Sequence, residues 1–176
     1  MKALYLLLLF PLLSTAPAEL GQYKDAMWLL KAHEGLVLEA YWDVSQYTIG
    51  WGTPSYKGER ITVAEADRRV LERYEREYLT LRRQYPKLDK WTARVVAIAR
   101  YNVGSFGPRM QKALASGDKD RIAKMLAKYN RVAGKVHPGI VRRRQQEVDL
   151  LYKGAWATEE LRTRDAVVAH IKRAKN

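Results

Sequence analysis

The chain has 176 residues, no cysteine, and 32 lysines and arginines against 19 acidic residues, which gives a net charge of +13. Its length and its 47% of hydrophobic residues suffice for one domain with a substantial core, so a wholly disordered chain is excluded. The missing cysteines exclude disulfide frameworks, thiolate metal sites and cysteine nucleophiles. We therefore expect a monomer without a metal ion or other cofactor.

The first 18 residues have the pattern of a secretory signal peptide. Lys2 supplies a positive start, residues 3–13 form an apolar run, and residues 16–18 (Ala-Pro-Ala) offer a cleavage site of small residues. This run is shorter than the roughly 20 apolar residues that span a bilayer. We expect export to the periplasm or the cell exterior after cleavage near Ala18, with residues 19–176 as a single domain. An uncleaved anchor is the alternative.

The first half of the mature chain predicts a helix, a small sheet and a second helix. Residues 23–33 carry apolar side chains at helical spacing and end before a glycine. Residues 36–58 interleave aromatic and β-branched residues with Gly, Ser and Asp, which is typical of a hairpin or short sheet. Thr62 and Glu65 form a capping box that begins a helix ending near Gln84.

The second half predicts helices only. The segment 90–103 is apolar on more than one face, so it is the candidate for a central buried helix. Further helices are expected at about 108–115, 118–129, 138–153 and 158–174. The last of these is basic, and we expect its apolar side to pack on the domain, with binding to an anionic membrane as the alternative.

Two carboxylates and a hydroxyl follow one another closely near the hairpin. Glu34 ends the first helix, Asp43 comes nine residues later, and Thr48 five residues after that. Cleavage of a glycosidic bond uses two acids, one protonated to donate to the leaving oxygen and one ionised to activate water. A threonine hydroxyl beside them would help to hold that water. Taken singly, a Glu before Gly commonly just ends a helix, and an Asp in a hairpin commonly just makes a turn.

In these residues the chain resembles the phage-type lysozymes of glycoside hydrolase family 24, which cleave peptidoglycan. The resemblance covers about residues 23–153 and leaves the last predicted helix unaccounted for. It rests on several motifs in a fixed order: Glu34-Gly35, Tyr41-Trp42-Asp43, Thr48-Ile49-Gly50-Trp51-Gly52, Ile61-Thr62-x-x-Glu65-Ala66, Tyr101-Asn102-Val103-Gly104 and Gly139-Ile140-Val141-Arg142-Arg143-Arg144-x-x-Glu147.

The resemblance implies a mostly helical α+β fold of the lysozyme-like type, with a small N-terminal β-hairpin lobe, a larger helical lobe and a cleft between them. It implies Glu34 as the general acid, Asp43 as the residue that activates water, and Thr48 as its helper. Hydrolysis of this kind inverts the anomeric carbon.

The resemblance also implies contacts with the substrate from the helical lobe, at Tyr101, Asn102 and Arg143. An arginine of the late helix pairs with the catalytic glutamate in relatives, and Arg143 is the best match among the three consecutive arginines, Arg142 to Arg144.

Two departures from the family pattern concern the hairpin. Only four residues separate Asp43 from Thr48, where many relatives have five, so a tighter hairpin is expected. Thr53 stands where relatives often have a histidine, which is expected to alter the support of the hairpin more than its chemistry.

We therefore predict an exported muramidase that hydrolyses the β-1,4 bond between N-acetylmuramic acid and N-acetylglucosamine. Its expected partners are peptidoglycan and the anionic cell-envelope surface, because the chain is strongly cationic. Nucleic acid is not expected, since no groove-reading motif is apparent. The alternatives are a lytic transglycosylase, against which Asp43 argues, and a non-catalytic cationic protein that damages membranes.

Overall fold

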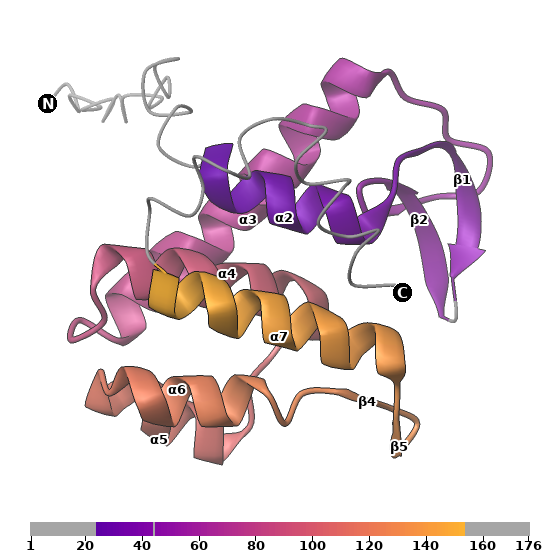
Figure 1. Ribbon diagram of the computed structural model, residues 1–176. Coiled ribbons are helices and arrows are strands. Elements are labelled where there is room, and N and C mark those ends of the chain that lie inside the picture. The colour runs from indigo at the N-terminus through magenta and orange to yellow at the C-terminus, as the bar shows by residue number, and fades with distance from the viewer. Residues whose placement is uncertain (1–23, 44, 154–176) are drawn as a thin grey trace, which may run out of the picture.

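The computed structural model describes residues 24–43 and 45–153, and it is a mostly helical α+β fold (Figure 1). Helix α2 (Lys24–Glu34) leads into an antiparallel sheet with the strand order β1-β2-β3. In Figure 1 this sheet lies at one end of the molecule. The strands are β1 (Val37–Asp43), β2 (Gln46–Gly50) and β3 (Thr53–Ser55).

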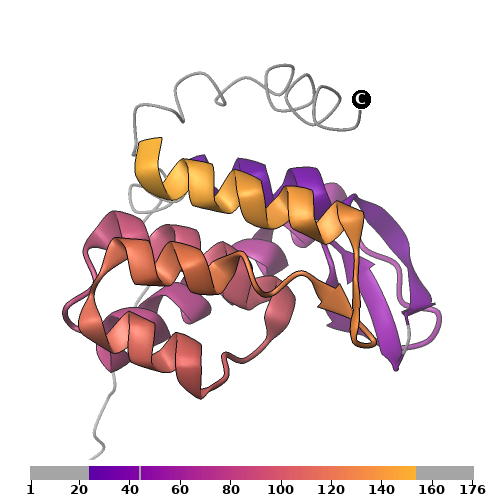
Figure 2. The same cartoon turned by 60° about the horizontal axis from the view of Figure 1, so that its bottom comes forward.

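The remaining elements are helices, apart from one short strand pair. They are α3 (Val63–Gln84), α4 (Lys90–Val103), α5 (Pro108–Ser116), α6 (Lys119–Leu126), β4 (Arg131–Val132), β5 (Lys135–Val136) and α7 (Pro138–Lys153). Figure 2 shows α7 crossing above the α5–α6 pair. The predicted signal peptide and the predicted helix 158–174 lie outside the described residues.

Helix α4 forms the centre of the core, as its apolar pattern predicts. Its residues 95–99 have no exposed surface at all, and α2, α3 and α7 all contact it. Trp91 of α4 donates its indole N–H to the carbonyl of Leu150 on α7, at 3.0 Å. Full burial of an aliphatic side chain contributes about 1.5–3 kcal/mol, so this helix fixes the position of its neighbours.

The predicted start of α3 is confirmed, but the capping box is only half made. The Thr62 hydroxyl accepts a hydrogen bond from the backbone N–H of Glu65 at 3.1 Å. The Glu65 carboxylate binds Arg68 and Arg69 instead of reaching back to the capping residue. Charge-assisted bonds to guanidinium groups are stronger than one to a neutral amide, which explains the preference.

The strand pair β4–β5 was not predicted, and helix α6 ends at Leu126, earlier than expected. Ala133 and Gly134 join the two strands with φ angles of 46° and 79°. Two successive positive φ angles are typical of the tight hairpin turn that Asn-Gly usually forms. Because Ala-Gly is not a typical sequence for this turn, the hairpin could not be predicted from it. None of the helices in residues 24–43 and 45–153 combines the length and apolarity that a membrane crossing requires.

Candidate active site

Glu34 lies where the β lobe meets the helices. It is the last residue of α2, and its side chain is 17% exposed. Arg143 of α7 approaches it from one side, with 2.7 Å between Nη2 and Oε1. From the other side comes Gly52, where a Cβ atom would lie only 2.9 Å from Oε2. One carboxylate oxygen is thus paired with a cation, and the other faces the turn between β2 and β3.

Among the three consecutive arginines, Arg143 is the one that reaches Glu34. Arg142 is exposed, whereas Arg144 is buried and donates to Oδ1 of Asn102 at 2.9 Å. Glu147, one turn further along α7, lies 3.0 Å from Arg144 and 3.4 Å from Arg143. Asn102 is therefore tied to α7, although it keeps an exposed position at the end of α4.

Asp43 and Thr48 lie on one face of the β1–β2 hairpin. Tyr41 pairs with Thr48 and Asp43 pairs with Gln46, so alternation puts Tyr41, Asp43 and Thr48 on the same side. Burial raises the pKa of the Tyr41 phenol, and the negative charges of Asp43 and Glu34 raise it further. The charges of both carboxylates thus act on the Tyr41 phenol.

The Thr48 hydroxyl is buried without a protein partner. Its residue is 4% exposed, and Oγ1 has no hydrogen-bond partner within the described part of the chain. A buried hydroxyl that lacks a partner costs about 1–3 kcal/mol. A position of this kind suits a group that receives its hydrogen bond from bound water or substrate.

Tyr101 and Arg73 hold the turn that faces Glu34. The Tyr101 hydroxyl donates to the carbonyl of Trp51 at 2.8 Å. Arg73 of α3 donates to the carbonyl of Gly52 and to that of Tyr101, both at 2.8 Å, and its guanidinium lies 4.0 Å from the centre of the Tyr101 ring. Tyr101 is only 2% exposed, and burial raises its pKa to about 12. This position differs from that expected of a substrate contact.

Sequence reasoning missed Arg73, because arginines occur along the whole of α3 and nothing in their spacing distinguishes this one. The turn has two further supports. Thr53, which stands in place of the family histidine, donates its hydroxyl to the carbonyl of Ile49 at 2.9 Å. Trp51 donates its indole N–H to Asp67 of α3 at 2.7 Å, and Lys31 binds the same carboxylate oxygen at 2.7 Å.

Within the described residues, no group of three or more metal-ligating side chains is close enough to hold an ion.

The family described as Phage lysozyme matches residues 31–147, a span that includes all the residues above. The chain belongs to the phage lysozyme family. The expected enzyme class, a glycoside hydrolase of lysozyme type, is thereby confirmed. A comparison with curated protein sequences gave no significant match.

Three solved structures are similar to this family member. The endolysin from Escherichia coli O157:H7 phage FAHEc1 is 26% identical, with a TM-score of 0.60 over 73% of this chain and 90% of that one. The muramidase domain of SpmX from Asticaccaulis excentricus is 20% identical, with a TM-score of 0.64 over 72% and 93%. The active form of the P1 phage endolysin Lyz is 15% identical, with a TM-score of 0.65 over 74% and 84%. These structures confirm the expected lysozyme-like fold.

Proposed function

We propose that the protein is an exported muramidase that hydrolyses the β-1,4 bond between N-acetylmuramic acid and N-acetylglucosamine in bacterial peptidoglycan. Glu34 acts as the general acid, Asp43 activates the attacking water, and Thr48 helps to hold that water. Family membership supports the substrate class. The assignment of roles is supported most by the partly buried Glu34 carboxyl beside Arg143, and by the hairpin register that puts Asp43 and Thr48 on one face.

The two oxygens of Glu34 have different surroundings, and this suggests how the proton moves. Arg143 pairs with Oε1, so Oε2, beside the Gly52 turn, is the oxygen that carries the proton to the leaving sugar. After the transfer, the carboxylate is stabilised by the arginine already in place. Because Arg143 acts on Glu34, we assign it to the acid rather than to the substrate.

Asp43 and Thr48 act on the water. Asp43 is exposed at the end of β1, where its carboxylate can reach a water molecule and accept a proton from it. The unpaired Thr48 hydroxyl on the same face supplies the second contact that orients the water. A water that attacks from the face opposite the leaving group inverts the anomeric carbon.

The test compares Glu34→Gln and Asp43→Asn with the parent in clearing permeabilised bacterial walls. General acid–base groups contribute about 10²- to 10⁴-fold, so each variant should lose at least about a hundredfold in rate. Glu39→Gln is the matched control, because Glu39 lies on β1 and pairs only with exposed Arg60. Mass spectrometry of the released fragments should show reducing ends that have gained water.

Two other results would replace the proposal. Anhydro ends, with clearing that survives Asp43→Asn, would indicate a lytic transglycosylase. Unchanged clearing by all variants would indicate a cationic protein whose action needs no carboxylate.

Export and attraction to the anionic cell envelope complete the proposed function. We propose cleavage near Ala18, which N-terminal sequencing of the secreted chain would test. The mature chain loses Lys2 and keeps a net charge of +12, which concentrates the enzyme on anionic envelope polymers. Binding to walls should therefore weaken as ionic strength rises.

A further inference from the structure

The positive charge of the chain is concentrated in the segment that forms α5, α6 and β4–β5. Residues 108–136, which form these elements, contain eight lysines and arginines and two acidic residues, Asp118 and Asp120. In α3, by contrast, glutamates alternate with the arginines and pair with them. The segment therefore has a net charge of +6, although Arg121 pairs with Asp118.

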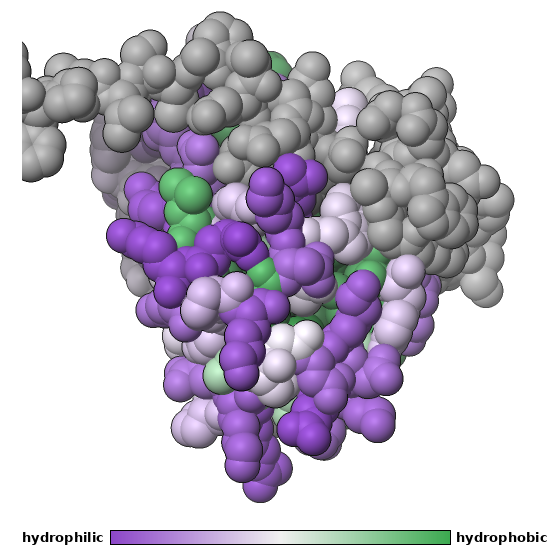
Figure 3. All heavy atoms as spheres, turned by 90° about the vertical axis from the view of Figure 1, so that its left-hand side faces the viewer, coloured by the Kyte–Doolittle hydropathy of each residue, from purple (hydrophilic) through white to green (hydrophobic). Residues whose placement is uncertain are grey.

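Two pairs of these cations lie at helical spacing. Arg109 and Lys112 are three residues apart on α5, and Lys124 and Lys128 are four apart on α6. All four are exposed and form no ion pair within residues 24–43 and 45–153. Figure 3 views the helical end of the molecule, and its lower part, at the height of α5 and α6 in Figure 1, is covered mainly by hydrophilic side chains. We call the surface of α5, α6 and β4–β5 the basic face.

The basic face also offers apolar surface between its cations. A pocket of about 450 Å³ opens between the start of α5 and the end of α6. Arg109 and Lys128 line it together with apolar groups of Pro108, Met110, Met125 and Tyr129. On β4–β5, the half-exposed Val132 and Val136 follow directly after Arg131 and Lys135.

We propose that the basic face docks on an anionic phospholipid membrane. The lysines and arginines pair with lipid phosphates. The apolar lining of the pocket and the two valines contact the apolar layer of the membrane just below the headgroups. A nucleic acid fits less well, because stacking of bases needs a free aromatic face. The Tyr129 ring packs edge-on against Phe106, and its hydroxyl accepts the N–H of Gly107.

The experiment measures binding of the full mature chain to vesicles of phosphatidylcholine, with and without phosphatidylglycerol. The test variant combines Arg109→Gln, Lys112→Gln, Lys124→Gln and Lys128→Gln. The control variant removes four exposed cations that lie elsewhere and form no ion pair within the described residues, through Lys57→Gln, Arg76→Gln, Arg83→Gln and Lys90→Gln. Each lysine or arginine near an anionic membrane surface contributes about 1 kcal/mol to the free energy of binding. The test variant should therefore bind anionic vesicles at least about tenfold more weakly than the control.

Each of three results would overturn the proposal. Equal losses in the two variants would mean that binding follows net charge alone. Absence of vesicle binding by the parent would remove the membrane as partner. Loss of binding to DNA or purified walls, with vesicle binding intact, would assign the basic face to another polymer.

A second, independent observation concerns the turn beside Glu34, and it rests on the proposed function. Tyr101 and Arg73 bind the carbonyls of the successive residues Trp51 and Gly52, and they are joined to each other by the Arg73–Tyr101 contact. Both come from the helical lobe, and the turn belongs to the lobe that carries Asp43. This is the only place in the described residues where a glycine Cβ would approach the Glu34 carboxylate.

We infer that Arg73 and Tyr101 are positioning residues, which fix the hairpin lobe, and with it Asp43, at the correct distance from Glu34. We call the contacts of Arg73 and Tyr101 with the turn, together with their contact with each other, the lock. Displacement of a reacting group by about 1 Å costs about a hundredfold in rate. A weakened lock should therefore lower kcat while substrate contacts, and KM with them, stay the same.

The test uses Arg73→Lys and Tyr101→Phe on soluble glycan fragments of peptidoglycan, with Arg76→Lys as the control one turn along the same helix. Lysine is a point charge that cannot bind two carbonyls as the planar guanidinium does, so kcat should fall about ten- to a hundredfold. Tyr101→Phe keeps the ring under Arg73 and should cost less. Thermal unfolding of each variant shows whether the loss follows from instability.

The inference is wrong if kcat stays at the parent value, if only KM changes, or if activity falls only in step with the unfolded fraction. It fails separately from the proposed function, because Glu34→Gln would still abolish activity in that case.

Discussion

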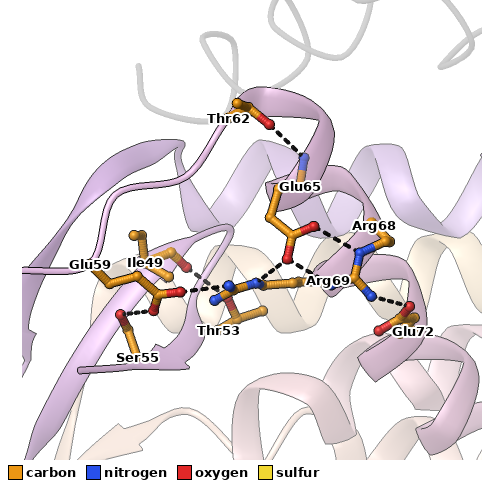
Figure 4. A network of polar contacts seen from close by, with 9 residues as sticks. All are labelled: Ile49, Thr53, Ser55, Glu59, Thr62, Glu65, Arg68, Arg69 and Glu72. Atoms are coloured by element: carbon orange, nitrogen blue, oxygen red, sulfur yellow. Dashed lines mark hydrogen bonds and ion pairs between the residues drawn. The ribbon is translucent and has the colours of Figure 1, made fainter.

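Two clusters of carboxylates and arginines, one on the surface and one in the interior, use the same groups to different effect. The surface cluster joins α3 to the β lobe (Figure 4). Arg69 lies 2.6 Å from Glu59 and 2.7 Å from Glu65, and Arg68 binds Glu65 and Glu72. Hydrogen bonds from Arg68 and then Arg69 lower the pKa of Glu65 to about 2.

The interior cluster of Glu34, Arg143, Arg144 and Glu147 is governed by burial instead. Glu147 has no exposed surface, and its burial raises the pKa of the carboxyl despite two neighbouring arginines. Burial likewise lowers the pKa of Arg144. Burial of each charge costs desolvation free energy, and the attraction of its oppositely charged partner offsets this cost. Removal of one partner therefore leaves an uncompensated buried charge and destabilises the cluster. What the interior cluster provides is a fixed orientation of Arg143 beside Glu34.

The largest effect is expected when the interior cluster loses its central anion. Glu147→Ala leaves Arg144 buried with only Asn102 as a partner, and it frees Arg143 on one side. Breaking a buried pair in this way should lower the free energy of unfolding by about 3–5 kcal/mol. Urea denaturation measures this loss. Glu72→Ala in the surface cluster is the matched control, and an equal loss there would abolish the distinction between the clusters.

A smaller effect is expected from two glycines, one beside each cluster. Gly52 and Gly58 both have a φ of 80°, but a Cβ would meet Glu34 only at Gly52 and would meet nothing within 4 Å at Gly58. Both alanine variants carry the strain of the backbone, about 1–3 kcal/mol. The free energy of unfolding should fall more in Gly52→Ala than in Gly58→Ala, and Gly52→Ala should also lose wall-clearing activity. Equal behaviour of the two would show that Glu34 does not depend on the close approach of the turn.

The smallest effect concerns Glu65 and appears as a dependence on pH. A carboxyl whose folded pKa lies below its unfolded value stabilises the fold above the unfolded value and loses this contribution as pH falls towards about 2. The difference in unfolding free energy between the parent and Glu65→Gln should thus be present at neutral pH and vanish between about pH 4 and pH 2. Denaturant titrations across this range measure it. Because Arg68 is exposed and Glu65 is partly exposed, added salt should reduce the same difference.

Local signals made much of the fold predictable. The Thr62 cap, the apolar run of α4 and the boundaries of α4, α5 and α7 depend on neighbours in sequence, and they agree with the structure, whereas α6 ends earlier than predicted. The β4–β5 pair escaped prediction because its exposed residues lack a buried face and its turn lacks the usual residues.

Only the residues of the candidate site that belong to local sequence motifs could be predicted. Glu34, Asp43 and Thr48 belong to one short stretch, whose residue types already suggest the chemistry. The supports come from far along the chain: Arg73 binds a turn 21 residues away, and Arg144 binds Asn102 over a separation of 42 residues. Such contacts depend on how α3, α4 and α7 cross, which no spacing along one helix reveals.

The register of the β1–β2 hairpin decides which changes of chain length the site can accept. Because Asp43 pairs with Gln46 and Tyr41 with Thr48, a residue gained or lost at the tip between Asp43 and Gln46 leaves both pairs in phase. A single insertion between Gln46 and Thr48 would instead turn the hydroxyl to the opposite side of the sheet. A shorter spacing between Asp43 and Thr48 is therefore compatible with both side chains on one face, provided that the tip is what shortens. Variation in loop length is tolerated where it leaves the register of the strands unchanged.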